Sequence, residues 1–318
     1  MNTGLINLKN AMEREGYISG DDLAVTVFLA LTLKKPLLVE GAPGVGKTEI
    51  AKVLGRVFDT NVIRLQCYEG LDENKALYEW NYQRQLLKIQ IMKDSCQQEG
   101  MEKDLFDEQY LLERPLLKAI RSEKRVVLLI DEVDKVDEPF EAFLFELLSD
   151  FQVSIPELGT LSARQIPIVV LTSNGDRELS DGLKRRCVYL YIDYPDIEKE
   201  VKILQTKVPE AGEKLNRQVA AAVNYIRSNL ELRKQPSISE SLDWVRALLA
   251  LNADALNTEN ISATTNLLLK NRDDSIQLLD PSVLSDLLKH VAGGSIENKG
   301  PASCACRGHQ HCSHSEQK

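Results

Sequence analysis

Eight consecutive residues have the types and spacing needed to grip a phosphate chain. They are Gly41, Ala42, Pro43, Gly44, Val45, Gly46, Lys47 and Thr48, which fit G-x-x-x-x-G-K-[ST] at every specified position. Glycines let the backbone curl so that several N–H groups meet phosphate oxygens, and a following helix adds its dipole. Lys47 would neutralise the β- and γ-phosphates, and the Thr48 hydroxyl would ligate Mg²⁺. A plain glycine turn, the alternative, does not explain Lys-Thr in register.

Two carboxylates follow an apolar run further along the chain. Residues 126–130 read Val-Val-Leu-Leu-Ile and lead directly into Asp131 and Glu132. Such strand ends face the crevice where ligands bind. Asp131 would hold the Mg²⁺ shell through water, and Glu132 would accept a proton from the attacking water, typically worth 10²–10⁴-fold. Alone, the pair could equally be a solvated strand end; together with the phosphate loop it predicts an ATP and Mg²⁺ site.

Short apolar runs without alternation predict the strands that position these residues. They lie at residues 36–40, 62–65, 125–130, 168–171 and 188–192, and are typical of strands buried on both faces of a parallel sheet. Helical patterns lie before and between them, at residues 21–33, 48–57 and 139–148. The alternation predicts an α/β fold in which helices cover both faces of a parallel sheet, an αβα core.

Pro195 marks the expected domain boundary, because no strand pattern follows it. We expect a nucleotide-binding domain over residues 1–195, a helical domain over 196–290 and a flexible tail over 291–318. Two inserts interrupt the first domain: a mostly helical stretch at about 71–121 and a β-hairpin at about 151–166.

Charge and composition exclude several classes of protein. Of 318 residues, 39 are Lys or Arg and 48 are Asp or Glu, a net charge of −9 that disfavours unspecific nucleic-acid binding. No apolar run reaches 18 residues, so we expect no membrane span, and the first ten residues lack a signal-peptide layout. We therefore expect a cytoplasmic protein, in which the scattered Cys67, Cys96 and Cys187 are reduced, buried thiols.

Three motifs of the chain, taken together, resemble those of the AAA+ ATPases. They are the loop at 41–48, the Asp131-Glu132 pair, and Leu-Thr-Ser-Asn at 171–174. The hairpin insert before residue 168 resembles the MoxR family. Residues 64–72 and 76–82, with 185–187 and 192–195, are similar to the MoxR branch found with carbon monoxide dehydrogenase and related molybdenum hydroxylases. The resemblance covers about residues 15–250.

The resemblance implies an AAA+ core with a C-terminal helical lid that hydrolyses ATP as a homo-oligomeric ring, expected to be a hexamer. Asn174 matches the sensor that orients the lytic water. Arg185 matches the arginine finger offered to a neighbouring subunit; Arg186 is the alternative finger, and a solvated basic turn is the other interpretation. The output would be remodelling of a metalloenzyme client, with a von Willebrand factor A-type partner.

One position departs from the family pattern. Where a second sensor arginine is usual, Glu240 stands, and a carboxylate cannot contact phosphate directly. Arg246 and Arg233 are substitutes by proximity only. Two readings also stay open for the aromatic residues at 78, 80 and 82: a substrate-gripping loop near a ring's pore, or, as we favour, packing of the insert onto the sheet.

The tail concentrates soft and borderline metal ligands. They are Cys304, Cys306, His309, His311, Cys312 and His314. Thiolate and imidazole suit Cu(I) or Zn²⁺, although the spacing matches no standard zinc finger; residues without a role are the alternative. Two rival functions therefore remain: a nucleotide-regulated metal-binding adaptor with negligible turnover, and a DNA-acting AAA+ motor, which the net charge argues against.

Overall fold

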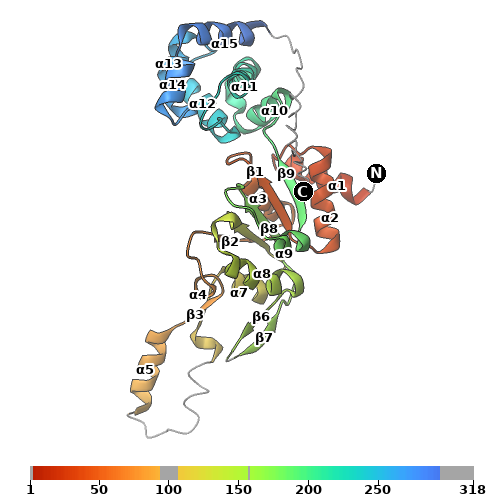
Figure 1. Ribbon diagram of the computed structural model, residues 1–318. Helices are drawn as coiled ribbons and strands as arrows, with labels where there is room; N and C mark the ends of the chain where they lie inside the picture. Colours follow the sequence, from red (N-terminus) through yellow and green to blue (C-terminus); the bar gives the residue numbers. More distant parts are fainter. Residues whose placement is uncertain (1–2, 94–106, 157, 294–318) are drawn as a thin grey trace, which may run out of the picture.

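The chain folds into an α/β core, a bundle of helices on one side of it and an arm on the other (Figure 1). A computed structural model describes residues 3–93, 107–156 and 158–293. The core contains a five-stranded parallel sheet with the order β2-β5-β8-β1-β9. Its strands are β1 (Leu37–Gly41), β2 (Val62–Gln66), β5 (Val127–Asp131), β8 (Ile168–Ser173) and β9 (Val188–Ile192). Each coincides with a predicted run to within two residues.

Helices cover both faces of the sheet, as the sequence predicts. On one face lie α1 (Thr3–Arg14), α2 (Asp21–Leu33) and α3 (Lys47–Val57), packed on Val127 and Leu129 of β5. On the other lie α7 (Pro115–Arg121) and α8 (Glu138–Asp150), packed on Leu128 and Ile130. The α/β class and the αβα layering are therefore confirmed.

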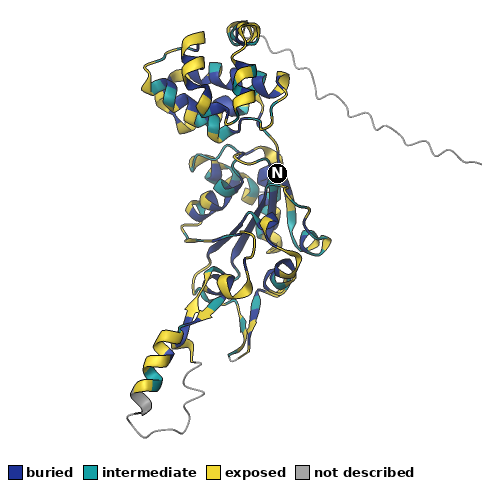
Figure 2. Cartoon of the chain, turned by 60° about the vertical axis from the view of Figure 1, so that its left-hand side comes forward, coloured by how far each residue is buried: buried dark blue, intermediate teal, exposed yellow. Residues whose placement is uncertain are grey.

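The two outer strands are not buried on both faces, so that part of the prediction is wrong. In β2 only Leu65 is buried, and in β9 exposed Tyr189 and Tyr191 alternate with buried Leu190 and Ile192. Both strands lie at edges of the sheet, where the helical layers cover them incompletely (Figure 2). A strand's own sequence does not reveal its place in the sheet order.

The first insert consists mostly of helices in the part that the structure describes, and it also contains a pair of short strands that the sequence did not predict. Its helices α4 (Glu73–Ala76) and α5 (Tyr82–Lys93) flank β3 (Tyr78–Trp80), which pairs antiparallel with β4 (Leu111–Glu113) after the turn η1 (Glu108–Tyr110). Strands of three residues are too short for a period-two pattern to register. Helix α5 forms the arm that projects from the core (Figure 1). The second insert is confirmed as a hairpin of β6 (Gln152–Ile155) and β7 (Gly159–Ser162).

The aromatic residues of this insert divide between the two interpretations. Trp80 is buried in the hydrophobic cluster that contains the sheet residues, and Tyr78 packs against that cluster. Their rings meet edge-on at 6.0 Å. Tyr82, by contrast, is 62% exposed on α5. The prediction that these aromatic residues pack the insert onto the sheet is thus correct for Tyr78 and Trp80 and wrong for Tyr82.

Beyond Pro195 the described chain is helical and has a hydrophobic cluster of its own. Its helices are α10 (Ile197–Lys207), α11 (Gly212–Asn229), α12 (Ile238–Ala250), α13 (Thr258–Leu268), α14 (Arg272–Leu278) and α15 (Pro281–Gly293). The preceding helix, α9 (Asp181–Arg186), belongs to the core. The short turns η2 (Val133–Lys135) and η3 (Pro209–Ala211) complete the elements. Trp244 is fully buried in the bundle and donates a hydrogen bond to Thr264 Oγ1 at 2.7 Å. Within the described ranges, no helix is both long and apolar enough to cross a bilayer.

A buried ion pair connects α10 and α11 of this bundle. Arg227 Nη1 lies 2.7 Å from Glu200 Oε2, both side chains are nearly inaccessible, and the guanidinium stacks on Tyr194. Glu200→Ala should lower the free energy of unfolding by about 3–5 kcal/mol, because it leaves the Arg227 charge buried without a partner. Urea denaturation measures this. Glu198→Ala, which breaks an exposed pair, is the control and should cost about 1 kcal/mol or less; equal losses would contradict the argument.

Cys67 is buried and Cys187 is half-buried, and both are free thiols, whereas Cys96 lies outside the described residues. The pKa of Cys67 and that of Cys187 are both raised to about 12, mainly because burial disfavours the charged thiolate. At pH 8 roughly one molecule in ten thousand would carry either thiolate, the reactive form. Iodoacetamide should therefore leave both unmodified in the native protein and alkylate both in urea, as peptide mass spectrometry would show. Fast native modification of Cys67 would contradict its burial, and fast modification of Cys187 would contradict its raised pKa.

Candidate nucleotide-binding site

The phosphate loop connects β1 to α3, as the sequence predicts. Gly46, the residue that caps α3, has a φ of 96°, and Gly44 has a φ of 78°, a left-handed backbone that favours glycine. Gly44 also abuts the helical bundle, because a Cβ placed there would lie 2.1 Å from Ser237 Oγ. The loop therefore lies where the core and the N-terminus of α12 meet.

Lys47 is buried at the centre of the site. Its Nζ donates to Gly41 O at 2.6 Å, to Ala42 O at 2.8 Å and to Asn174 Oδ1 at 2.8 Å. Burial lowers the pKa of this ammonium, and the nearby carboxylates, Asp134 foremost, act in the opposite direction. Lys47 thus both holds the loop's curl and presents a partly desolvated positive charge, an arrangement suited to a phosphate oxygen.

Thr48 and Asp131 meet at the predicted magnesium position. Thr48 Oγ1 lies 3.0 Å from Asp131 Oδ1, which also accepts a hydrogen bond from Thr172 Oγ1 at 2.5 Å. Hydroxyl and carboxylate oxygens are the ligands that Mg²⁺ prefers, so these residues fit the ion. When bound, Mg²⁺ would supply Lewis-acid stabilisation of the phosphate charge.

The second Asp131 oxygen is held by a residue that sequence reasoning missed. Arg64 of β2 donates to Asp131 Oδ2 from Nε at 3.0 Å and from Nη2 at 2.6 Å. Asp131 is 4% exposed, so this two-pronged contact provides a counter-charge for a buried carboxylate. A charged residue in a short apolar strand was the available signal.

Glu132 lies beside Asp131 but points to a different partner. Its Oε2 accepts a hydrogen bond from Gln66 Nε2 at 3.0 Å, and its backbone N–H donates to Thr172 Oγ1 at 2.9 Å. Its φ of 57° is left-handed, a backbone conformation that residues other than glycine rarely adopt. Gln66, like Arg64, lies on β2 and was not among the predicted site residues.

Asn174 follows β8 and is brought to Lys47 through its side-chain oxygen. Its backbone N–H donates to Asp134 Oδ2 at 3.0 Å, which fixes the turn that carries it. Within the described chain the other oxygen of Asp134 is buried without a partner. Asn174 therefore stands beside the lysine that would meet the γ-phosphate.

The two candidate finger residues differ in their surroundings. Arg186 is engaged within its own chain, donating to Ser149 Oγ at 2.6 Å and stacking on the Phe145 ring at 4.5 Å. Arg185 is exposed and makes no hydrogen bond or ion pair with any residue that the structure describes. Of the two, Arg185 is the one that the described chain leaves unengaged.

Glu240 has a structural role that explains its presence at the start of α12. Its carboxylate accepts hydrogen bonds from the Ser237 hydroxyl and, at 3.0 Å, from the Ser237 backbone N–H, forming a capping box. Burial raises its pKa, but these bonds outweigh burial, and the net shift is downward. The two substitute candidates are both in exposed ion pairs, Arg246 with Asp243 and Arg233 with Asp273.

The predicted copper or zinc ligands at residues 304–314 lie outside the described residues. Elsewhere, across the described ranges, no group of three or more His, Cys, Asp or Glu side chains is placed to hold a metal ion.

The fold and the site define a nucleotide-binding protein of the P-loop class. More particularly, residues 36–187 match the family described as AAA domain (dynein-related subfamily), and the chain carries an AAA+ core. Two uncharacterized proteins of Staphylococcus aureus are 26% identical over 233 residues and 27% identical over 230 residues; each match covers 69% of this chain and 77% of the relative. Among solved structures, the Holliday junction branch migration motor RuvB of Thermotoga maritima is 18% identical, with a TM-score of 0.48 over 81% of this chain and 72% of that chain.

Proposed function

We propose that this protein hydrolyses ATP at a site completed by a second copy of itself. The linked set of Lys47, Thr48, Asp131 and Asn174 supports this, because it gathers the groups that grip a triphosphate and orient water. Water attacks the γ-phosphate in line, Glu132 takes the proton, and Arg185 of the neighbouring protomer stabilises the charge that develops on the transferred group.

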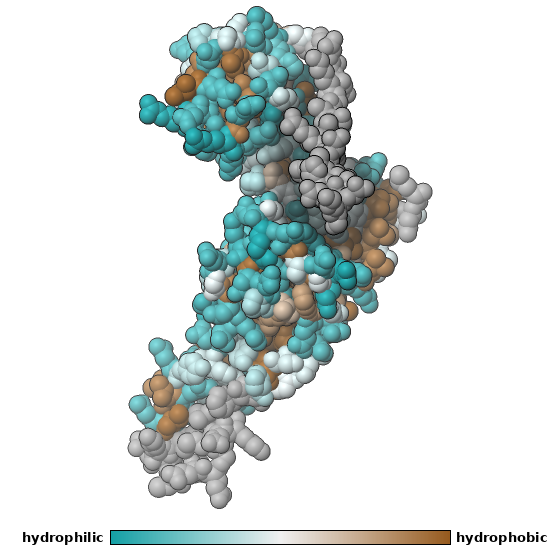
Figure 3. All heavy atoms as spheres, viewed as in Figure 1, coloured by the Kyte–Doolittle hydropathy of each residue, from teal (hydrophilic) through white to brown (hydrophobic). Residues whose placement is uncertain are grey.

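Two surface features support assembly into a ring, for which we propose six protomers. Arg185 is exposed and unpaired within the described chain, as a residue acting in a neighbour's site must be. Apolar side chains also gather outside α1 and α2, where Ile6, Val25, Leu29 and Leu33 are all at least 37% exposed (Figure 3). A patch of this kind marks an interaction site.

We infer that the work of the ring is chaperone-like remodelling in the cytoplasm, as in the MoxR family. The resemblance of residues 64–82 and 185–195 supports a metalloenzyme client and a von Willebrand factor A-type partner. The arm adds a surface for contact with a client, because α5 exposes Tyr82, Leu86 and Leu87 far from the sheet.

Phosphate release from ATP tests the proposal. The wild-type protein at assembling concentrations should release phosphate continuously, and Glu132→Gln should bind ATP but turn over 10²–10⁴-fold more slowly.

Because the slowed variant prolongs contact with its client, pull-down with Glu132→Gln should also enrich a metalloenzyme over the wild-type control. No wild-type turnover would instead favour the nucleotide-regulated adaptor.

Gln66 should restrain the Glu132 carboxylate, the proposed base, and so lower the basal rate of ATP hydrolysis. Gln66→Ala removes a hydrogen bond that holds the Glu132 carboxylate, and loss of about 1 kcal/mol of restraint would raise basal turnover about fivefold. Steady-state phosphate release measures the change, and the double variant Gln66→Ala/Glu132→Gln should remain inactive. A lower basal rate in Gln66→Ala would show that Gln66 instead positions Glu132 for catalysis.

A further inference from the structure

One edge of the central sheet has backbone groups that no described residue satisfies. Val127 N–H donates to Asn61 O at 3.0 Å, and Cys67 N–H donates to Asp131 O at 2.8 Å. Because a strand's backbone groups alternate in direction, residues 61, 63, 65 and 67 pair with β5, and Val62, Arg64 and Gln66 turn theirs outward. Within the described chain, nothing hydrogen-bonds to these outward N–H and C=O groups. Such an edge is a template for another strand.

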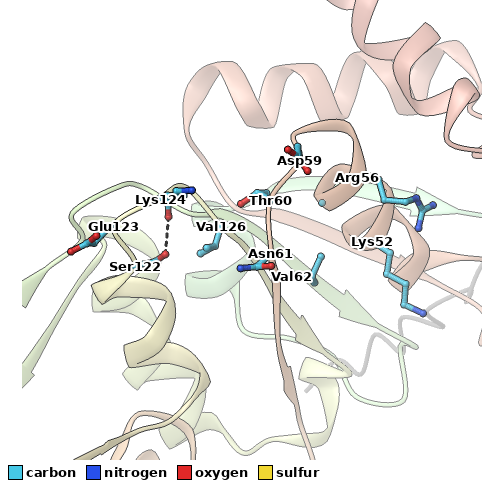
Figure 4. A pocket seen from close by; sticks show the side chains of 11 residues that line it. Lys52, Arg56, Asp59, Thr60, Asn61, Val62, Ser122, Glu123, Lys124 and Val126 are labelled. Atoms are coloured by element: carbon cyan, nitrogen blue, oxygen red, sulfur yellow. Dashed lines mark hydrogen bonds between the residues drawn. The ribbon is translucent and has the colours of Figure 1, made fainter. Parts of the chain in front are cut away.

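Two hollows flank this edge and share five lining residues, Asn61, Val62, Ser122, Glu123 and Val126. One, of about 740 Å³, lies between the end of α3 and residues 122–126 (Figure 4). The other, of about 870 Å³, lies along β2 toward α7. Since α3 and α7 cover opposite faces of the sheet, the hollows stand on opposite sides of the plane in which a new strand would lie. Successive side chains of an added strand point to opposite faces, so each hollow would take alternate residues.

The lining is basic in a chain of net charge −9. Eight Lys and Arg residues line the two hollows against three acidic residues. Five of the eight are already in ion pairs, but Lys52, Lys118 and Lys124 are exposed and have no acidic partner among the described residues. Lys52 stands on the α3 side and Lys118 on the α7 side, so unpaired positive charge faces both hollows.

We propose that an extended acidic segment of a partner protein docks on β2 as a sixth strand of the sheet. The outward backbone groups of Val62, Arg64 and Gln66 supply main-chain hydrogen bonds, which give affinity without regard to sequence. The unpaired lysines select carboxylates on both faces of the incoming strand. Strand β2, which receives the segment, also carries Arg64 and Gln66, and these hold Asp131 and Glu132. Occupancy of this edge therefore acts directly beside the nucleotide site.

Binding of a designed probe tests this without any measurement of ATP hydrolysis. The probe is a fluorescein-labelled nine-residue peptide, Glu-Glu-Val-Val-Glu-Glu-Val-Val-Glu, which places Glu on both faces of a strand. Its binding to the full-length protein is followed by fluorescence anisotropy, and its counterpart replaces each Glu by Lys. The acidic probe should bind and weaken as salt rises, and the basic probe should not bind. Equal binding of the two probes, or no binding of the acidic one, overturns the proposal.

Two sets of variants locate the binding. The triple variant Lys52→Glu/Lys118→Glu/Lys124→Glu should weaken the acidic probe at least tenfold. Val62→Pro, which removes one outward N–H and leaves the bonds to β5 intact, should do the same, while Val62→Ala should stay within about twofold of wild type. Urea denaturation checks that each variant is folded. Unchanged binding to the triple variant overturns the proposal, as does a loss of self-assembly in Val62→Pro, which would assign the edge to a second copy of this chain.

Discussion

Lys47→Ala should weaken ATP binding by at least about 100-fold. The substitution removes the buried ammonium that would meet the β- and γ-phosphates, and it also releases Gly41 O and Ala42 O, which hold the loop in its curl. Both the charge and the preorganised backbone are lost together. Titration calorimetry with ATP and Mg²⁺ measures the affinity directly.

Lys52→Ala is the matched control for this prediction. Lys52 lies on the same helix, α3, but is exposed and takes no part in the loop's hydrogen bonds. Its removal should leave the affinity for ATP within about twofold of wild type. If Lys47→Ala binds ATP as well as Lys52→Ala does, the phosphate loop is not the nucleotide site.

Arg185→Ala should slow hydrolysis by about 10³-fold or more and leave ATP affinity nearly unchanged. The reason is that an arginine finger acts on the transition state, where charge develops on the γ-phosphate, rather than on the bound ground state. Single-turnover hydrolysis separates this effect from binding. Arg185→Lys should recover little, because an ammonium lacks the planar fork of a guanidinium.

Arg186→Ala provides the contrasting variant. Since Arg186 is held by Ser149 and Phe145, its loss should reduce stability rather than selectively reduce turnover. A larger specific loss of turnover in Arg186→Ala than in Arg185→Ala would assign the finger to Arg186.

The sequence predicted the parts of the site that lie close together along the chain. The loop at 41–48 and the Asp131-Glu132 pair each occupy one strand end, so local pattern was enough to find them. Arg64 and Gln66 could not be found in this way, because their roles depend on β2 lying next to β5 in the sheet. Sheet order is a long-range property that spacing along the chain does not encode.

Local pattern also failed where tertiary packing decided the outcome. The first insert contains the β3–β4 pair because Trp80 buries itself against the core, a contact that a three-residue strand does not announce. Glu240 was noticed as a missing arginine, whereas the three-residue spacing from Ser237 was a capping-box signal. In that case the information was present and a functional expectation displaced it.

Mixing two inactive variants tests most directly whether ATP is split between protomers. Glu132→Gln lacks the base and Arg185→Ala lacks the finger, so each assembly alone should be inactive. After subunit exchange at equal amounts, some sites lie between an Arg185→Ala protomer and a Glu132→Gln protomer. Such a site is intact when the Arg185→Ala protomer supplies the base, Glu132, and the Glu132→Gln protomer supplies the finger, Arg185. Random assembly of a ring then predicts recovery of about a quarter of wild-type phosphate release. A mixture that exchanges subunits and stays as inactive as its two components would contradict a shared site.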